Sequence, residues 1–456
     1  MGRWLGVRAW WIFLGMVIGA GSLFAAESPV ERIEGETVLP HICIATGGQE
    51  ISKLAEIKAS FFMYRDSIDH LPHGETAPTV EQWLPIEIKK RGFSSSLYAK
   101  KQYTLSFLDE QNKNRQLAML GLSAGKKWVL NGPYVDRTQV RNALVYQWGR
   151  QLGRDRHTWF APETRFVELT VEGDYKGIYA ITQRIERSKT RVDLPKIDFA
   201  HPEATPYFMM KVESFNGPVH TKAHTKLDWV YPTNGDMEEL TQENPQQAKA
   251  VQKSIVDQLD HFEAVLKSDD FDHPELGYRP LIDMDSFVDY MVIQEVTKNT
   301  DAYRKSLYLH KGADGQIYLG PLWDFDLALG NLWFYGQNKT SGWNFKRTSF
   351  FHGNTAVFWF KRLMKDPYFA KAFVARYQQL RQQMFSDSKV DADIDALTRA
   401  MPRSAIERNQ HRWRHMFNPL FRIVMNRPPF PGKFDRNVLM MKEWMHRRLA
   451  WLDSNI

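Results

Sequence analysis

Four side chains that could bind a metal or handle a proton lie within residues 295–331. Asn299 and Asp301 follow a stretch with helical spacing, and Asp324 and Asp326 flank a phenylalanine in a turn rich in aromatic residues and glycine. Alternating residues between the two pairs predict a hairpin, which would bring the pairs together. Phosphoryl transfer needs metal ligands and a carboxylate beside the incoming hydroxyl group. The segment therefore predicts a phosphotransferase-type site.

Each of these residues also has a purely structural interpretation. Asp324 and Asp326 would point to opposite faces of a strand, so that one faces the site while the other caps the following turn. Alternatively, both cap that turn. Asp301 and Asn299 could simply end the preceding helix.

A second group of residues, a small-residue turn and three positively charged side chains, could bind phosphate. Residues 91–96, RGFSSS, form a small-residue turn whose backbone N–H groups could surround a phosphate. Arg91, Lys100 and Lys101 are the predicted phosphate-binding side chains. Because neighbouring strand residues alternate in direction, we expect only one of the two lysines to reach the phosphate, and we favour Lys101. The alternative is a solvated strand end.

The spacing of apolar residues predicts the elements that position these groups. Residues 38–130 alternate in short segments separated by Gly, Pro and Asp, which is typical of strands. Residues 138–152 have helical spacing, with Thr138 as the expected N-cap and Gly153 as the expected end. Further strands are predicted at 165–172, 175–183, 207–213 and 226–231.

The second half of the chain is richer in helical spacing, with one hairpin at 305–320 around an Ala-Asp-Gly turn. We therefore expect an α+β protein. Its predicted parts are a β-rich N-terminal lobe at 38–245 and a helical C-terminal lobe at 246–456 that carries the acidic site. The predicted helices of the second lobe are 246–268, 284–298, 355–384, 390–412 and 435–453.

The N-terminus has the features of an export signal. Residues 1–26 combine Arg3 and Arg8 with an apolar run that ends in small residues, and residues 27–37 resemble a linker. We expect a cleaved signal peptide and a secreted, periplasmic or cell-surface location. An uncleaved membrane anchor is the alternative, and it is the only membrane contact we expect.

Composition restricts the kinds of protein and of site that remain possible. The chain of 456 residues has a net charge of +7, but its Lys and Arg residues are spread along the sequence, so nucleic-acid binding has no support. The single cysteine, Cys43, excludes an intrachain disulfide. Because Cys43 alternates with Ile42 and Ile44, we expect a buried strand thiol rather than a nucleophile.

Four motifs, in the same order along the chain, resemble those of the CotH family of spore-coat-type atypical kinases. The resemblance covers residues from about 38 to about 380, and the terminal helices are less distinctive. The motifs are LPIEIKKRGFSSSLYAKKQYTLSF, AMLGLSAGKKWVLNGPYVDRTQVRNAL, VELTVEGDYKGIYAITQRI and PLWDFDLALGN.

The resemblance implies a distant protein-kinase-like fold and an exported kinase that uses ATP with Mg²⁺ or Mn²⁺. Its expected partners are proteins with Ser or Thr acceptors. Asp301 matches the family's catalytic aspartate, and Asp324 matches its metal-binding aspartate. Asp326 and Asn299 are further candidate metal ligands, and Arg91, Lys100 and Lys101 are the candidate ATP-binding residues.

Two positions depart from the kinase pattern. Kinases carry a metal-binding Asn five positions after the catalytic Asp, where this chain has Ser306. Gln183 stands where many relatives have a Glu that would position a lysine. These departures support a second hypothesis, a nucleotide-binding pseudokinase or scaffold of the cell envelope. A carbohydrate-active protein with two carboxylates is a third, but it leaves the basic segment 91–101 unexplained.

Overall fold

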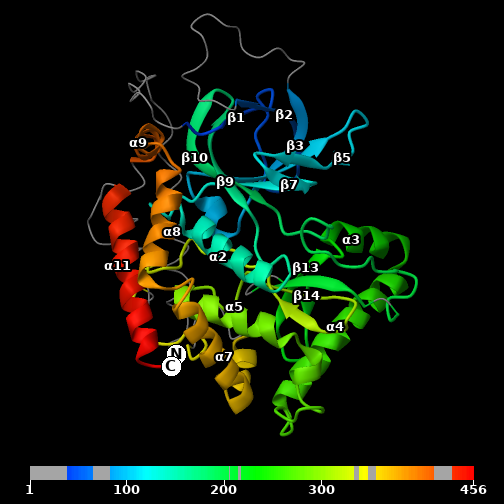
Figure 1. Ribbon diagram of the computed structural model, residues 1–456. Coiled ribbons are helices and arrows are strands. Elements are labelled where there is room, and N and C mark those ends of the chain that lie inside the picture. Colours follow the sequence, from blue (N-terminus) through cyan, green and yellow to red (C-terminus); the bar gives the residue numbers. More distant parts are fainter. Residues whose placement is uncertain are drawn as a thin grey trace, which may run out of the picture. The chain divides into compact units, whose positions relative to one another are not determined.

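Alternating apolar residues in the first half of the chain form an eight-stranded sheet that closes on itself. In the computed structural model the strand order is β3-β2-β1-β9-β10-β8-β4-β5, and β3 also pairs with β4. This second pairing joins the ends of the sheet, so the strands form a barrel-like structure (Figure 1). The strands are β1 (His41–Ala45), β2 (Ile57–Tyr64), β3 (Leu84–Arg91), β4 (Gln102–Leu108), β5 (Asn114–Arg115), β8 (Lys127–Asn131), β9 (Thr164–Val171) and β10 (Asp174–Gln183).

The structure describes residues 38–64, 83–204, 206–213, 217–332, 338–347, 356–414 and 434–456. The predicted signal peptide and linker, residues 1–37, lie outside the described residues. Within the described ranges, no helix is both long enough and apolar enough to cross a membrane.

The barrel interior is filled by side chains from every second strand position. Ile86 and Ile88 of β3, Leu105 of β4, and Trp128 and Leu130 of β8 belong to this buried cluster. A period of two places such residues on one face of a strand. The other face of the same strands is therefore available to pack against the helices or to carry polar groups.

Cys43 lies on β1 between Ile42 and Ile44, whose side chains are buried in the barrel. The thiol is half-buried, and burial raises the pKa of Cys43 to about 11. A protonated thiol is a poor nucleophile. Cys43 is therefore a strand thiol and a poor nucleophile, as expected, although it is half-buried instead of buried.

A second sheet is built from strands that are far apart in the sequence. Its order is β12-β13-β11-β14-β15, and β11 pairs with both β13 and β14. It therefore joins strands from both sides of the predicted lobe boundary at residue 245. Its strands are β11 (Phe208–Val212), β12 (Val219–His220), β13 (Lys226–Tyr231), β14 (Leu307–Lys311) and β15 (Ile317–Leu319), and a separate pair is formed by β6 (Leu117–Met119) and β7 (Leu122–Gly125).

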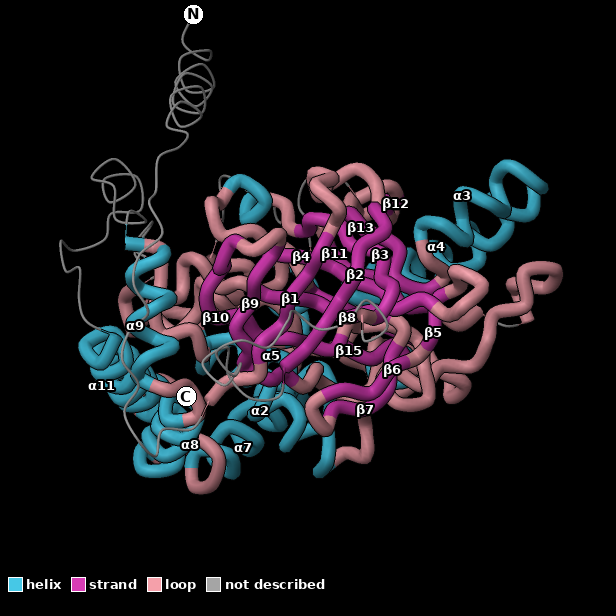
Figure 2. The backbone as a smooth tube through the Cα atoms, turned by 90° about the horizontal axis from the view of Figure 1, so that it is seen from above, coloured by secondary structure: helices cyan, strands magenta, loops and turns pink. Residues whose placement is uncertain are grey.

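Helices dominate the second half of the described chain, which makes the protein α+β as expected. Figure 2 shows α3 and α4 on one side of the strands and α8, α9 and α11 on the opposite side. The described helices are α2 (Arg141–Asp155), α3 (Asn234–Glu243), α4 (Pro245–Lys267), α5 (Met284–Thr297), α6 (Val357–Leu363), α7 (Pro367–Arg381), α8 (Asp387–Arg399), α9 (Arg403–Arg412) and α11 (Phe434–Asp453).

Several predicted helix boundaries were wrong. Pro367 begins α7 and Pro402 precedes α9, so the predicted helices 355–384 and 390–412 are each divided. Proline lacks the N–H that a helix interior needs and clashes with the preceding turn, but it fits a helix start. The unpredicted helix α3 begins with a capping box between Thr233 and Asp236.

Helix α2 also begins later than predicted, because Asp136 rather than Thr138 binds its start. The Asp136 carboxylate accepts hydrogen bonds from the backbone N–H groups of Thr138 (3.0 Å) and Arg141 (2.9 Å). Gly153 lies inside the helix instead of ending it.

Helix α5 is the central helix of the C-terminal half. Its residues from Phe287 to Thr297 are all buried, including the polar Asp289, Gln294 and Glu295. It packs against α2, α7, α11 and β15. The residues that follow its C-terminus, Asn299 and Asp301, are therefore attached to a rigid element.

Candidate functional site

The end of α5 turns sharply into the segment that holds Asp301. Lys298 ends the helix in a left-handed conformation with φ of 46°. The Asn299 side-chain oxygen then accepts a hydrogen bond from the Asp301 N–H at 3.2 Å. The Asp301 carbonyl accepts bonds from the N–H groups of Arg304 and Lys305. This turn holds the Asp301 side chain in a nearly buried position, with 8% of the residue exposed.

The turn from Asp324 to Asp326 is held by helix α2. The Asp324 N–H donates to the Tyr146 hydroxyl at 3.2 Å, and the Phe325 N–H donates to the Asn142 side-chain oxygen at 2.7 Å. Asp324 has φ of 68°, outside the strand region. The two aspartates therefore lie in a turn, as the sequence predicted, and need not point to opposite faces.

The carboxylates of Asp301, Asp324 and Asp326 lie close enough to influence one another. Burial raises the pKa of Asp324, and the Asp301 charge raises it further. Burial raises the pKa of Asp326 well above its usual range, and the charges of Asp324, Asp136 and Asp301 add to this effect. Like charges in one buried site disfavour ionisation. The structure therefore brings together three of the predicted site residues.

Lys305 is the cation that these carboxylates share, and the sequence analysis missed it. Its ammonium nitrogen lies 3.9 Å from the Asp301 carboxylate. Burial alone would favour the neutral amine, but Asp301, Asp324 and other carboxylates raise the pKa of Lys305. Its position four residues after Asp301 was the available signal, because a turn brings such residues together.

Arg91, a predicted phosphate-binding residue, lies at the end of β3 and extends the site onto the barrel. Its guanidinium stacks on the Trp323 ring at 5.1 Å and donates to the Gln102 side-chain oxygen at 3.4 Å. Burial lowers the pKa of Arg91, and Tyr308 and Asp324 oppose this shift. Arg91 therefore lies between the barrel and the acidic turn.

The turn that follows Arg91 reaches the same cluster. Gly92 has φ of 100°, which favours glycine. The ring of Phe93 lies 5.9 Å from the Lys305 ammonium nitrogen. Residues 91–93 thus face the acidic segment, although they are far from it in sequence.

The structure does not place Lys100 in this cluster. Lys100 is 1% exposed, and its ammonium donates to the Gln139 side chain (3.2 Å), the Ile178 carbonyl (2.5 Å) and the Asn409 side chain (3.0 Å). Three acceptors satisfy all of its donors. These contacts join the barrel to α9. A role for Lys100 in binding ATP stays a prediction.

Lys101, the favoured lysine, points toward the turn that follows Arg91. Its ammonium donates to the Ser96 carbonyl at 2.9 Å, and burial followed by the charge of Lys90 lowers its pKa. Lys101 is therefore near the small-residue turn, and no interaction with the three aspartates is seen. A phosphate-binding role for Lys101 stays a prediction.

Arg184 is a further cation that the sequence analysis did not select. It follows β10 and interacts electrostatically with Arg91 and Tyr308. Among the described residues, its guanidinium makes neither a hydrogen bond nor an ion pair. Two neighbouring arginines repel one another, so Arg91 and Arg184 together favour an anion between them.

The two departures from the kinase pattern have separate explanations. Gln183 donates to the Ser123 hydroxyl at 2.8 Å and accepts from the Glu163 N–H at 2.8 Å, so it holds neighbouring chain segments. The Ser306 hydroxyl lies 3.5 Å from the Asp324 carboxylate. Ser306 is thus in the site, whereas Gln183 pairs with no lysine of the described ranges.

Arg141 supports the acidic turn from α2. Its guanidinium forms an ion pair with Asp136 and donates to the backbone carbonyl oxygens of Ala328 (3.1 Å) and Leu329 (3.4 Å). These contacts give Arg141 a structural role. Asn331 likewise donates to the Asp326 carbonyl at 2.5 Å.

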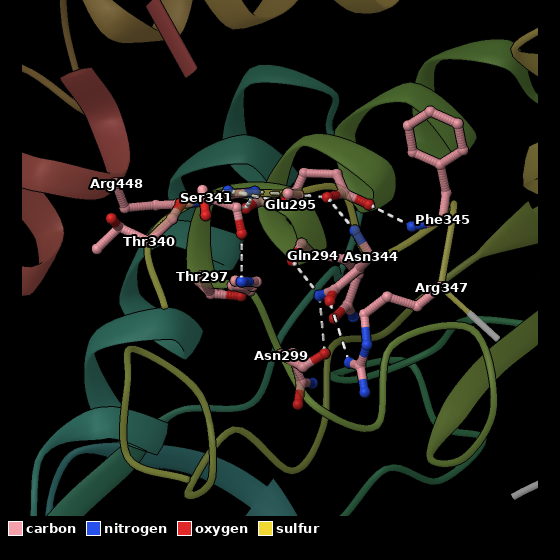
Figure 3. A network of polar contacts seen from close by, with 12 residues as sticks. Gln294, Glu295, Thr297, Asn299, Thr340, Ser341, Asn344, Phe345, Arg347 and Arg448 are labelled. Carbon is pink, nitrogen blue, oxygen red and sulfur yellow. Dashed lines mark hydrogen bonds and ion pairs between the residues drawn. The ribbon is translucent and has the colours of Figure 1, made fainter. Parts of the chain in front are cut away.

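A second polar network holds the other side of Asn299 (Figure 3). The Glu295 carboxylate accepts from the N–H groups of Asn344 (2.8 Å) and Phe345 (2.9 Å). The Asn344 side chain donates to the Asn299 carbonyl at 2.9 Å. Arg448 of α11 donates to the Glu295 carbonyl through two nitrogens, at 2.9 and 2.6 Å. The C-terminal helix therefore supports the segment that carries Asp301.

The donor set fits a divalent cation held jointly with phosphate. Among the described residues, no group of three or more His, Cys, Asp or Glu side chains could hold a metal alone. However, Mg²⁺ is usually bound by one or two carboxylates together with substrate phosphates. Asp324 and Asp326 supply two crowded carboxylates, and their mutual repulsion would be relieved by a cation.

The comparison with protein families agrees with this arrangement. The family model described as CotH kinase protein matches residues 88–452, which include all of the site residues described above. No curated protein matches the chain. The match covers most of the sequence, and the chain therefore belongs to the CotH kinase protein family.

Proposed function

We propose that this protein is an exported, metal-dependent protein kinase that transfers the γ-phosphoryl group of ATP to Ser or Thr of partner proteins. Membership of a kinase family supports phosphoryl transfer in general. One observation carries the proposal further: Lys305 interacts with both Asp301 and Asp324, and Arg91 lies beside them. We propose that this arrangement belongs to a distant relative of the protein-kinase fold.

Each charged group has a proposed role. Asp301 orients the acceptor hydroxyl and takes its proton, while Asp324 and Asp326 hold Mg²⁺ or Mn²⁺, with Asn299 as a neighbouring ligand. The metal would neutralise negative charge on the phosphates when bound. Arg91 and Lys305 stabilise phosphate charge from opposite sides of the acidic turn.

The experiment is phosphate transfer from γ-labelled ATP by purified residues 27–456, with Mg²⁺ or Mn²⁺. Asp301→Asn and Asp324→Asn keep the size of the side chains and remove one charge each. We expect Asp301→Asn to bind ATP but to lose transfer, and Asp324→Asn to lose metal-dependent ATP binding. Asp269→Asn, at an exposed position, is the matched control. Undiminished transfer by both site variants would refute the proposal.

The second candidate is a nucleotide-binding pseudokinase. Ser306 favours it, because a hydroxyl beside Asp324 is a weaker metal ligand than the amide found there in kinases. Gln183 adds to this, since it pairs with no lysine. Metal-dependent ATP binding by calorimetry, without transfer to the protein itself or to a generic acceptor, would select this alternative.

A further inference from the structure

A cavity of about 770 Å³ lies where the end of α2, the start of α5, the β14–β15 hairpin and residues 189–194 meet. None of the predicted site residues lines it. Its volume is in the range of pockets that bind small molecules.

The cavity and the acidic site lie at opposite ends of the same elements. Helix α2 begins at Arg141 beside the acidic turn and reaches the cavity at Arg156. Asp283, the N-cap of helix α5, lines the cavity, and the helix leads to Asp301 at its other end. A helix of 14 residues spans about 20 Å. The cavity is therefore distinct from the acidic site.

The cavity contains more carboxylates than cations able to neutralise them. Arg156 forms ion pairs with Asp285 and Asp289, and Arg376, outside the cavity lining, also pairs with Asp289. Arg191 also lines the cavity, but its guanidinium is directed to Glu186, at 3.2 Å, and to backbone carbonyls.

Three lining carboxylates form no ion pair with any described residue: those of Asp193, Asp283 and Asp314. Asp193 and Asp314 are exposed, Asp314 accepts a hydrogen bond from the Tyr318 hydroxyl, and Asp283 accepts one from the Ser286 N–H at 2.7 Å. Among the described lining residues, Lys189 is a further cation. Unpaired carboxylates favour a ligand with positive charge.

The aromatic wall of the cavity points to the same class of ligand. The rings of His310 and Tyr318 stack at 5.2 Å with an angle of 11°. The His310 Nδ1 lies 3.2 Å from the Gly320 carbonyl, and burial lowers the pKa of His310 to about 4. A neutral ring that donates through Nδ1 presents Nε2 as an acceptor. Trp159 and Phe160 add further aromatic surface.

We propose that this cavity binds a guanidinium or ammonium group carried on an aliphatic chain. Carboxylates and the imidazole nitrogen accept its N–H groups, and the aromatic rings pack against its positive charge and its methylene groups. The same chemistry can come from an arginine or lysine side chain of a polypeptide or from a free amine such as agmatine.

Calorimetric titration of residues 27–456 with agmatine, and separately with an acetylated and amidated Gly-Arg-Gly peptide, tests the proposal. Both are titrated without ATP, so the result does not depend on kinase activity. Binding of agmatine alone identifies a free amine as the source, and tighter binding of the peptide identifies a polypeptide. Absence of binding by both ligands overturns the proposal.

Variants locate the binding. We expect Asp193→Asn and Asp314→Asn each to weaken it about threefold, and the double variant about tenfold. Asp272→Asn, at an exposed position outside the cavity, should leave it unchanged. Asp324→Asn should also leave it unchanged, because the acidic site is separate. Equal binding by wild type and double variant, or its loss in Asp324→Asn, would show that the cation binds elsewhere.

Discussion

The ammonium nitrogen of Lys305 lies 3.9 Å from the carboxylate of Asp301, four residues earlier in the chain. The same ammonium group interacts with Asp324 and Asp326, which come from a separate segment. One lysine therefore compensates carboxylates on both sides of the β14–β15 hairpin. We therefore expect substitution of Lys305 to affect the carboxylates of both segments.

Replacing Lys305 with Gln should destabilise the metal-free protein by about 3 kcal/mol, because the buried carboxylates lose their shared cation. Added Mg²⁺ should restore part of the loss. Urea unfolding at neutral pH, with and without Mg²⁺, measures both effects. Lys371→Gln, at an exposed position on α7, is the control. An unchanged midpoint for Lys305→Gln would contradict the shared-cation interpretation.

Because the buried aspartates lie close together, we can predict the direction in which the stability of the folded protein changes with pH. The pKa values of Asp324 and Asp326 are raised above their usual value of 3.8 in the folded protein. Above pH 3.8 the unfolded chain loses protons that the folded chain retains, so stability falls as pH rises. Asp326→Asn should flatten this fall and raise the midpoint of thermal unfolding at pH 7. We would compare both proteins with EDTA present, and a steeper fall in the variant would contradict the assignment.

Because Arg91 and Lys100 lie in different surroundings, their substitution should affect the KM for ATP differently. Arg91→Ala should raise the KM for ATP about tenfold, because one charged hydrogen bond to phosphate is lost. Lys100→Met should leave this KM unchanged, since Lys100 binds Asn409 and the Ile178 carbonyl. Steady-state kinetics with both variants make the comparison. A raised KM for Lys100→Met would return that lysine to the ATP site.

Lys100 should also give a separate signal in unfolding experiments. Burial lowers the pKa of Lys100 to about 7 from its usual value of 10.5. Between these pH values the unfolded chain binds a proton that the folded chain lacks. The contribution of Lys100 to the free energy of unfolding therefore increases as pH rises. Lys100→Met should lack this gain between pH 7 and pH 9.5.

Two neighbouring arginines of α11 offer a matched test of its supporting role. Arg448 is fully buried and binds the Glu295, Thr340 and Gly342 carbonyls, whereas Arg447 is exposed. Arg448→Ala should cost about 3 to 5 kcal/mol of stability, because Glu295 loses its buried partner. Arg447→Ala should cost less than about 0.5 kcal/mol. Equal midpoints in urea unfolding would exclude this role for α11.

Local sequence patterns were enough to predict the parts of the site that depend on nearby residues. The hairpin predicted at 305–320 appears as β14 and β15, and the aspartates before and after it come together. The helix breaks at Pro367 and Pro402 were also visible in the sequence, although they were missed. These features depend on residues only a few positions apart.

The parts that could not be predicted depend on contacts between distant residues. Strand alternation indicated that Lys100 and Lys101 point in different directions, but not that Asn409 of α9 would bind Lys100. Arg184 gave no signal in the sequence, because its position beside Arg91 follows from the order of strands in the barrel. The cavity likewise needs four separate segments to exist.

The pairing of β11 with β14 has a consequence for how the chain folds during synthesis. The edge of β11 that pairs with β14 has no partner until residues 307–311 have left the ribosome. During that time β11, with Phe208, Met209 and Met210, is an apolar strand with one unpaired edge, which invites association with other chains. Fragments that end near residue 245 keep this edge permanently, so we expect them to aggregate.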